Sequence, residues 1–247
     1  MKKVLLFSAL MMLMSCQTFD KNKNVIYLVG DSTMATKTSD KKPETGWGEV
    51  LSDFFQEGIQ IDNHAVNGRS SKSFRSEGRW QTIMDKLQKN DVVFIQFGHN
   101  DSKIKSPDRY SSPEQYYQNL AEFVEEVRAK KAIPVLLTPV VRRRFDDNGQ
   151  FYRTHGDYPK MVRKLAAEKA VFLIDMQAKS EKLLIEMGEM TSEKLYLWLK
   201  EGEHDNYPQG VADNTHFSEV GAKVMANLVV EGIKNSELSI KKYLLPM

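Results

Sequence analysis

Short apolar runs, each ending in glycine or polar residues, recur along the chain and predict strands. The first covers residues 25–29, five consecutive apolar residues that are followed by Gly30-Asp31-Ser32-Thr33. A continuous apolar run of this length is typical of a strand buried on both faces of a parallel sheet. Residues 59–63 are a further strand candidate with only two apolar residues, and apolar runs predict strands at residues 91–97, 133–137 and 171–174.

Between these runs, apolar residues recur at helical spacing, which predicts helices that pack against the sheet. One helix is predicted from Trp47, Val50, Leu51 and Phe54, and a second from Tyr116, Leu120, Phe123, Val124 and Val127, after a capping box in Ser112-Pro113-Glu114-Gln115. A third is predicted from Met161, Val162 and Leu165, and a final helix, capped by Ser218, is expected to turn Val220, Val224 and Leu228 inward.

Strands that alternate with helices predict an α/β fold with a parallel sheet covered by helices on both faces. Right-handed crossovers bring the carboxyl ends of such strands to one edge, where open α/β folds bind ligands. Long connections at residues 98–112, 138–159 and 200–218 are expected to be functional. Because no repeat, low-complexity tract or linker divides residues 25–247, we expect a single domain there.

The N-terminal segment has a different pattern. Met1-Lys2-Lys3 is basic, residues 4–14 are apolar but too few to span a membrane, and Leu13-Met14-Ser15-Cys16 resembles a bacterial lipobox. We therefore expect residues 1–16 to be a lipoprotein-type signal peptide with Cys16 as the lipidated residue, and residues 17–24 to be a polar tether. The protein would be exported and anchored to a bacterial membrane, in the periplasm or at the cell surface. The alternative is an ordinary secretory signal with an incidental cysteine.

Composition changes this picture little. The 247 residues are 41% hydrophobic and 28% charged, which is ordinary for a globular protein with a sizeable core. Of the 35 basic residues, Lys2 and Lys3 would leave with the signal, so that 33 remain beside 33 acidic ones. A neutral chain with scattered charges gives no reason to expect nucleic-acid binding. Cys16 is the only cysteine, so an intrachain disulfide is impossible.

The candidate chemistry lies in four polar motifs. Gly30-Asp31-Ser32, Asn67-Gly68-Arg69-Ser70 and Gly98-His99-Asn100-Asp101 follow three predicted strands, and Asp213-Asn214-Thr215-His216 precedes the final helix. A catalytic serine needs a base within hydrogen-bond reach and a group that orients the base. Ser32, His216 and Asp213 are the candidates for these roles. A serine after a strand is also a common turn or cap residue, so the other three motifs are what favours catalysis.

Acyl transfer also requires hydrogen-bond donors for the developing oxyanion. The backbone N–H groups of Ser32 and Gly68 and the side-chain amide of Asn100 are the candidate donors. The alternatives are that Gly68 only makes a turn and that Asn100 only stabilises a loop. Asp31, His99 and Asp101 are interpreted as residues that hold these loops together, and no role is assigned to His64, His155 or His204.

In this order, the four motifs resemble those of the SGNH (GDSL-like) hydrolase superfamily, named for Ser, Gly, Asn and His, here Ser32, Gly68, Asn100 and His216. Together with Gly46-Trp47-Gly48, they look most like the motifs of rhamnogalacturonan acetylesterases. The resemblance covers residues 25–234 and implies a three-layer α/β/α fold with a flavodoxin-like sheet and no metal or organic cofactor. It implies a serine carbohydrate esterase that removes O-acetyl groups from the pectin backbone through an acetyl-enzyme.

Some side chains outside the motifs are candidate substrate contacts. Arg142 and Arg143 belong to the basic run Arg142-Arg143-Arg144 after the fourth strand. Such a run is usually solvated surface, yet cations beside the active site would suit a galacturonate-bearing polymer. Tyr207 could stack on a sugar ring, as could Trp198, for which core packing is the alternative.

Other functions stay open at this point. Esterases that act on xylan or other acetylated sugars share these motifs. A metal-dependent phosphoesterase could use Asp31, His99, Asn100, Asp101 and His216 as ligands, but its two-metal site would need a further histidine close to the first acid. Activity that survives EDTA would exclude it. A non-catalytic glycan-binding lipoprotein has no need for a serine paired with a base, and labelling by a fluorophosphonate would distinguish it from an esterase.

Overall fold

The computed structural model describes residues 24–246. The predicted signal peptide, Cys16 and all but the last residue of the predicted tether lie outside these residues. One parallel sheet of five strands forms the centre, in the order β2-β1-β3-β4-β5. Its strands are β1 (Asn24–Gly30), β2 (Ile59–Asn63), β3 (Val92–Gln96), β4 (Ile133–Leu137) and β5 (Phe172–Ile174). This is the strand order of flavodoxin-like folds, which confirms the predicted class.

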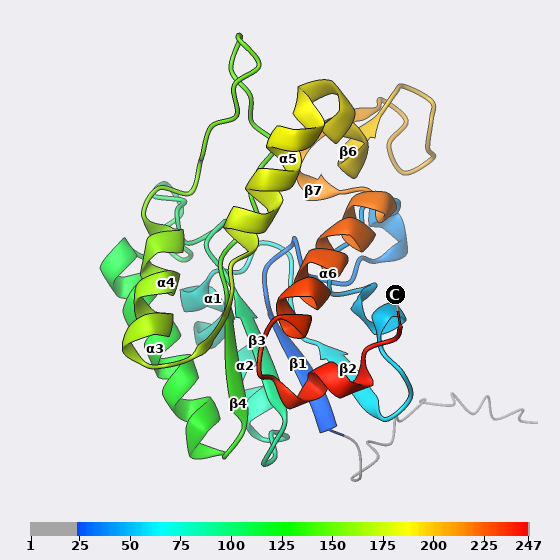
Figure 1. The fold of residues 1–247 in the computed structure, drawn as a ribbon. Helices are drawn as coiled ribbons and strands as arrows, with labels where there is room; N and C mark the ends of the chain where they lie inside the picture. The colour runs from blue at the N-terminus through cyan, green and yellow to red at the C-terminus, as the bar shows by residue number, and fades with distance from the viewer. Residues whose placement is uncertain (1–23, 247) are drawn as a thin grey trace, which may run out of the picture.

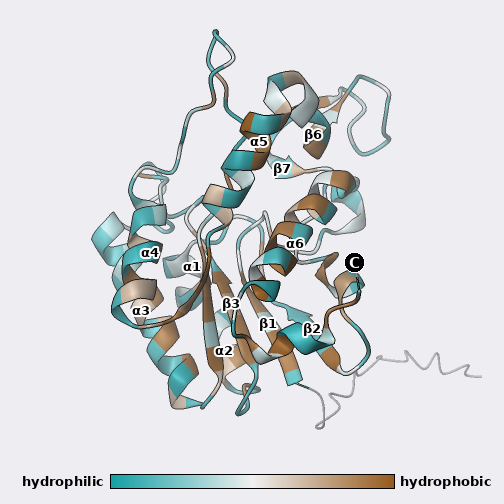
Figure 2. Ribbon diagram, viewed as in Figure 1, coloured by the Kyte–Doolittle hydropathy of each residue, from teal (hydrophilic) through white to brown (hydrophobic). Residues whose placement is uncertain are grey.

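Helices cover both faces of the sheet (Figure 1). One face carries α1 (Ser71–Ser76), α2 (Arg79–Met84), α3 (Pro113–Ala129) and α4 (Tyr158–Glu168), and the other carries α5 (Met176–Ser192) and α6 (Glu219–Lys234). Alternate residues of β1 point to opposite faces, so that Tyr27 packs in one apolar cluster and Leu28 in the other. Figure 2 shows the apolar strands between helices whose outer faces are hydrophilic. The three-layer α/β/α architecture is therefore confirmed.

An antiparallel hairpin was not predicted from the sequence. It consists of β6 (Tyr196–Leu199) and β7 (Val211–Phe217), and it lies above the carboxyl edge of the sheet in Figure 1. His216 is consequently held on a strand and not in a loop. Short 3-10 helices complete the described chain: η1 (Ser39–Lys41), η2 (Leu51–Phe54), η3 (Glu193–Leu195) and η4 (Ser239–Tyr243).

The helix predicted around Trp47 is wrong, because only the short η2 forms there. Backbone donors of this segment bind the turn after β1: Trp47 N–H donates to the carbonyl of Thr33 (3.0 Å) and Gly48 N–H to that of Met34 (3.1 Å). A Cβ at Gly46 would lie 2.2 Å from the Ala35 carbonyl oxygen, so the segment requires glycine for this close approach. The apolar spacing reflects packing of an irregular segment against the core.

Two other helix predictions have different outcomes. The capping box at the start of α3 is confirmed, since Ser112 Oγ accepts from Gln115 N–H and Gln115 Oε1 accepts from Ser112 N–H. Ser218 caps α6 as predicted, and Val224 and Leu228 pack against the core, but Val220 does not turn inward, because it is 56% exposed. The buried face includes Gly221, where a Cβ would lie 1.7 Å from the Leu195 carbonyl oxygen. This close contact sets the rotation of the helix.

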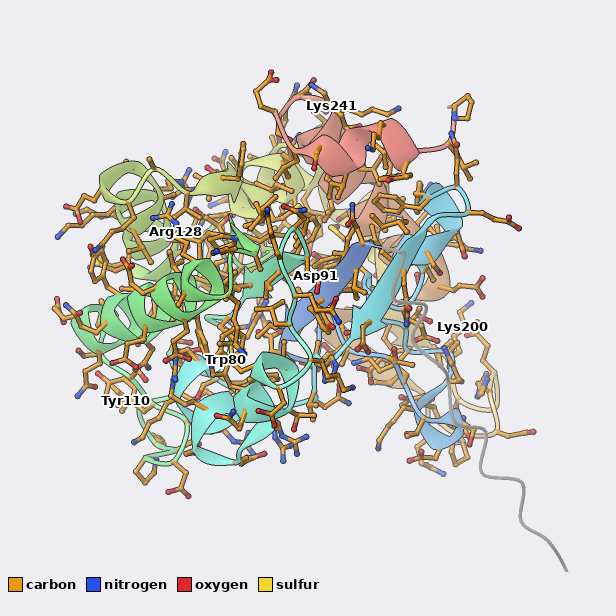
Figure 3. The ribbon with its side chains drawn as sticks, turned by 90° about the horizontal axis from the view of Figure 1, so that it is seen from below. Trp80, Asp91, Tyr110, Arg128, Lys200 and Lys241 are labelled. Carbon is orange, nitrogen blue, oxygen red and sulfur yellow. The ribbon has the colours of Figure 1, made fainter. Side chains whose placement is uncertain are left out.

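The amino edge of the sheet, seen from below in Figure 3, is fastened by Asp91. Its carboxylate accepts hydrogen bonds from Val25 N–H (3.0 Å) and Gln88 N–H (2.8 Å), and thereby ties the start of β1 to the approach to β3. The opposite, carboxyl edge carries the long connections, including an arm between β4 and α4 that projects from the molecule in Figure 1. Among residues 24–246, no helix has both the length and the apolar character needed to cross a membrane.

Candidate active site

The turn that carries Ser32 follows β1 directly. Asp31 organises it: its carbonyl accepts hydrogen bonds from the N–H groups of Met34 (3.2 Å) and Ala35 (3.1 Å), and its carboxylate accepts from Thr33 N–H (3.0 Å). Burial raises the pKa of Asp31, while the hydrogen bonds from Thr33 act in the opposite direction. Asp31 thus holds the loop, as expected, and leaves Ser32 at the surface of the site.

Ser32, His216 and Asp213 meet although 184 positions separate the serine from the histidine. Ser32 Oγ lies 2.9 Å from His216 Nε2, and His216 Nδ1 lies 2.7 Å from Asp213 Oδ2. The structure therefore brings together the three residues predicted to act as nucleophile, base and orienting acid. The strand β7 supplies the second and third of them, and the turn after β1 supplies the first.

Asp213 is fixed by its own strand. Its Oδ1 accepts hydrogen bonds from the backbone N–H groups of Thr215 (2.6 Å) and His216 (3.1 Å), which leaves Oδ2 for the imidazole. Burial opposes ionisation, but the hydrogen bond and charge of His216 and the two backbone donors outweigh it and lower the pKa of Asp213. An ionised Asp213 keeps the proton of His216 on Nδ1, so that Nε2 is free to accept a proton from Ser32.

Two backbone donors of the predicted oxyanion hole are available. Gly68 has a φ of +78°, a conformation that favours glycine, in the turn that leads to the Ser70 cap of α1. Within the part of the chain that the structure describes, neither Gly68 N–H nor Ser32 N–H donates a hydrogen bond to a protein group. Both can therefore bind a substrate oxygen.

Asn100 connects the third motif to the second. Its Nδ2 donates to the carbonyl of Arg69 (3.0 Å), which orients the amide and leaves its second hydrogen for a ligand. Asp101 anchors the same turn, since its carboxylate accepts from the N–H groups of Ser71 and Gly98, both at 3.0 Å. Burial raises the pKa of Asp101 to about 7, although the Ser71 hydrogen bonds oppose the shift. Asp101 is thus a loop-holding residue, as expected.

His99 is supported by a residue that the sequence did not reveal. Its Nδ1 lies 3.1 Å from Nε2 of His155, and the two rings pack edge to face with centroids 4.4 Å apart. Burial, followed by the charge of Arg142, lowers the pKa of His155 to about 3. The buried histidine pair fastens the Asn100 turn to the base of the arm. No local pattern could have indicated it, because the partners are 56 positions apart.

A cavity of about 350 Å³ opens over Ser32 and His216. Its wall also includes the predicted oxyanion residues Gly68 and Asn100, and in addition Lys41, Glu44, Lys103 and Tyr207. Tyr207, a predicted substrate contact, lines the cavity while its hydroxyl donates to the Lys41 carbonyl (3.0 Å). Contact between Tyr207 and a sugar stays a prediction. Lys103 was not predicted to line the site. Its position two residues after Asp101, at the end of the third motif, could have indicated this.

Arg143 is not placed to contact substrate, so that prediction is wrong. Only 5% of the residue is exposed, and its guanidinium donates to Asn214 Oδ1 (2.9 Å) and to the carbonyl of Glu189 (2.7 Å). It also packs against the ring of Trp198 at 5.2 Å. Arg143 therefore fastens β7 to α5 and uses its donors within the fold.

Arg142 is half-buried behind the Asn100 turn. It donates to the carbonyl of His99 (3.3 Å) and to Thr154 Oγ1 (3.2 Å), and it forms no ion pair with a described residue. Its charge, after burial and the charge of Arg109, lowers the pKa of Lys103. Arg142 therefore does not line the cavity, but its charge acts on Lys103, which does.

The alternative of a metal-dependent phosphoesterase requires a set of metal ligands, and the described residues do not provide one. Between residues 24 and 246, no three His, Cys, Asp or Glu side chains are grouped so that they could hold a metal ion. Of the proposed ligands, Asp101 accepts hydrogen bonds from Ser71 and Gly98, and His99 pairs through Nδ1 with His155.

This arrangement has the parts needed for acyl transfer: a hydroxyl beside a base, an acid that orients the base, and free donors beside the hydroxyl. The sequence profile of the GDSL-like Lipase/Acylhydrolase family matches residues 28–224, which include all four motifs. The chain belongs to this family. It is therefore a carboxylic ester hydrolase.

One curated protein and two solved structures illustrate what this chain is similar to. The rhamnogalacturonan acetylesterase RhgT of Bacillus subtilis (strain 168) is 43% identical over 219 residues, which cover 89% of this chain and 93% of RhgT. The crystal structure of Bacillus subtilis YxiM has a TM-score of 0.75 at 25% identity, over 88% of this chain and 58% of YxiM. The acetylxylan esterase Axe2 of Geobacillus stearothermophilus has a TM-score of 0.62 at 17% identity, over 88% of this chain and 98% of Axe2, and shows the same fold.

We expect Asn100→Ala to lower kcat by about 10²–10³-fold, because it removes a side-chain donor that acts on the oxyanion. KM for a nitrophenyl acetate should change little. The matched control is Asn148→Ala, at an exposed position in the arm. Steady-state kinetics of both variants test the role, and an Asn100→Ala kcat within about twofold of the parent would remove Asn100 from the oxyanion hole.

Proposed function

We propose that this esterase removes O-acetyl groups from rhamnogalacturonan, a galacturonate-bearing plant polysaccharide, through an acetyl-enzyme. The observation that carries the proposal is the Ser32–His216–Asp213 array, which opens into a cavity with cations on its wall. The names of the relatives support an acetylated carbohydrate as the substrate class. Acetylxylan or another acetylated sugar is the alternative substrate within the same reaction class.

The reaction follows from the geometry in two steps. His216 Nε2 accepts the proton of Ser32 Oγ while the oxygen attacks the acetyl carbonyl, and the oxyanion binds the free N–H groups of Ser32 and Gly68 and the amide of Asn100. The sugar oxygen then leaves with the proton from His216. Water, deprotonated by His216, attacks the acetyl-Ser32 ester and releases acetate.

Three cations in or near the cavity wall, without ion-pair partners among the described residues, support a substrate that carries carboxylates. Lys103 lines the cavity, and its lowered pKa reflects burial together with the charges of Arg109 and Arg142. Arg109 lies close to the oxyanion turn, since a Cβ at Gly68 would be 3.4 Å from Arg109 Nη1. None of these three cations forms an ion pair within the described part of the chain. A galacturonate carboxylate would supply the missing countercharge.

Lys103→Met should lower kcat/KM on acetylated rhamnogalacturonan by about 3–10-fold, the range expected for one partly solvated charge contact. On neutral acetylated xylan the change should be less than about twofold. Lys105→Met, an exposed lysine in the same loop and outside the cavity wall, is the matched control. An equal loss on both polymers would contradict recognition of a carboxylate by Lys103.

Acetate release from acetylated rhamnogalacturonan, xylan and chitin fragments tests the substrate. We expect the highest kcat/KM on the galacturonate polymer, and a fall in that value as salt screens the cations. Preference for xylan at every ionic strength would favour the alternative substrate and leave the serine mechanism intact.

We also propose that Cys16 is lipidated and that the protein is exported and anchored to a membrane, periplasmic or at the cell surface. The lipobox-like Leu13-Met14-Ser15-Cys16 supports this proposal. Expression in a bacterial host with a labelled fatty acid should label the parent but not Cys16→Ala. Equal labelling of both proteins, or of neither, would contradict it.

A further inference from the structure

Lys37 is a buried cation that the reaction described above does not use. Its side chain is 0% exposed, which is rare for lysine and costs desolvation unless the charge is paired. The ammonium group donates to the carbonyl of Ser32 and to Asn67 Oδ1 (2.7 Å), and it lies 2.8 Å from Glu44 Oε1. Its three hydrogens therefore face three oxygen acceptors.

These acceptors belong to separate parts of the site. The Ser32 carbonyl is in the residue that supplies both the nucleophile and one oxyanion donor. Asn67 immediately precedes Gly68, which supplies the second donor, and Glu44 lines the cavity over Ser32. A single buried ammonium thus links the nucleophile turn to the oxyanion turn.

Two other connections hold the start of the oxyanion turn. The side chain of Asn63 donates to the Met34 carbonyl (3.0 Å) and accepts from Ala65 N–H (3.1 Å). Val66 N–H donates to the Gly30 carbonyl (3.1 Å), and this bond does not involve any side chain. It fixes the start of the oxyanion turn against the end of β1, whereas the lysine fixes Asn67, one position from the donor itself. Loss of Lys37 would leave these bonds and the Asn100–Arg69 bond in place, but it would remove the direct tie between Asn67 and the Ser32 carbonyl.

We propose that Lys37 is a positioning residue, which sets the distance between the Gly68 oxyanion donor and Ser32. It acts through Asn67 and the Ser32 carbonyl and does not touch the reacting atoms. Transition-state stabilisation by fixed donors depends steeply on geometry, so that a displacement of about 1 Å can cost about 10²-fold in rate. The loss should fall on kcat, because the donors bind the oxyanion and not the ground-state ester.

Lys37→Met and Asn67→Ala test this role with a nitrophenyl acetate, with active sites counted by a fluorophosphonate. We expect kcat per active site to fall about 10–100-fold in Lys37→Met and about 3–10-fold in Asn67→Ala, with KM within about threefold of the parent. The double variant should lose little more than Lys37→Met, because both changes remove the same link. Affinity for a boronate that mimics the tetrahedral intermediate should fall in parallel with kcat. Lys42→Met, which removes the neighbouring Lys42–Glu49 ion pair outside the cavity, is the control.

The alternative is that Lys37 only supports the fold. A Lys37→Met protein with fewer active sites but a normal kcat per site would show such a role and overturn the proposal. A double variant whose loss of kcat equals the product of the two single losses would also overturn it. Lys37→Met leaves the buried Glu44 without its partner, and this variant could fail to fold. Asn67 is exposed, so Asn67→Ala should fold in either case. A kcat within about twofold of the parent in Asn67→Ala would then overturn the proposal by itself. Failure here is distinct from failure of the esterase mechanism, which is measured separately by Ser32→Ala.

Discussion

Replacing Ser32 by alanine should lower kcat for acetate release by about 10⁴-fold or more, since no other group can take the acetyl group at this position. The expected loss is large because the oxyanion donors and His216 cannot compensate for a missing nucleophile. Substrate binding should persist, because the cavity wall is otherwise unchanged. Rates on acetylated rhamnogalacturonan and on a nitrophenyl acetate measure the effect.

The fold of this variant should be intact. Ser32 Oγ hydrogen-bonds to His216 Nε2 at 2.9 Å, and one hydrogen bond contributes about 1 kcal/mol to stability. Circular dichroism and thermal unfolding check this, with the exposed Ser52→Ala as the matched control. A folded Ser32→Ala protein that retains turnover would refute serine catalysis.

Asp213→Asn should lower kcat by about 10³–10⁴-fold with little change in KM. The asparagine amide would face His216 with a hydrogen in place of a lone pair, or would present that hydrogen to the N–H groups of Thr215 and His216. Either orientation disturbs the tautomer of His216 that can accept a proton from Ser32. The kinetics should be measured above the pH range in which Asp213 of the parent titrates, and this range is low because its pKa is lowered.

Asp205→Asn is the matched control for this prediction. Asp205 is exposed in the connection between β6 and β7 and is not part of the cavity wall. Its replacement should leave kcat within about twofold of the parent. If Asp213→Asn behaved in the same way, Asp213 would not be the residue that orients the base.

The central strands and the start of α3 could be predicted because their signals are local. A strand covered on both faces must be apolar throughout, as residues 25–29 are, and the α3 capping box lies within four consecutive residues. Three of the site residues could also be predicted, because their motifs follow predicted strands. Parallel strands end at one edge, so the motifs at Ser32, Gly68 and Asn100 had to lie near one another.

The features that the sequence did not reveal depend on contacts between distant segments. β7 was missed because its residues are mostly polar, since the strand carries Asp213 and His216 to the site. The segment at Trp47 satisfied helical spacing, but close backbone approach at Gly46 decides its conformation. Lys37 resembled the surface lysines beside it, and only the three-dimensional arrangement shows that it is buried.

The acetyl-enzyme provides the most direct test of the central claim that Ser32 and His216 act together. Acid quenching during turnover of an acetylated substrate, followed by mass spectrometry of peptides, should find one acetyl group on Ser32 in the parent protein. His216→Ala should show no such group on the same timescale. Acetate release without acetylation of Ser32, or with the acetyl group on another residue, would contradict the account.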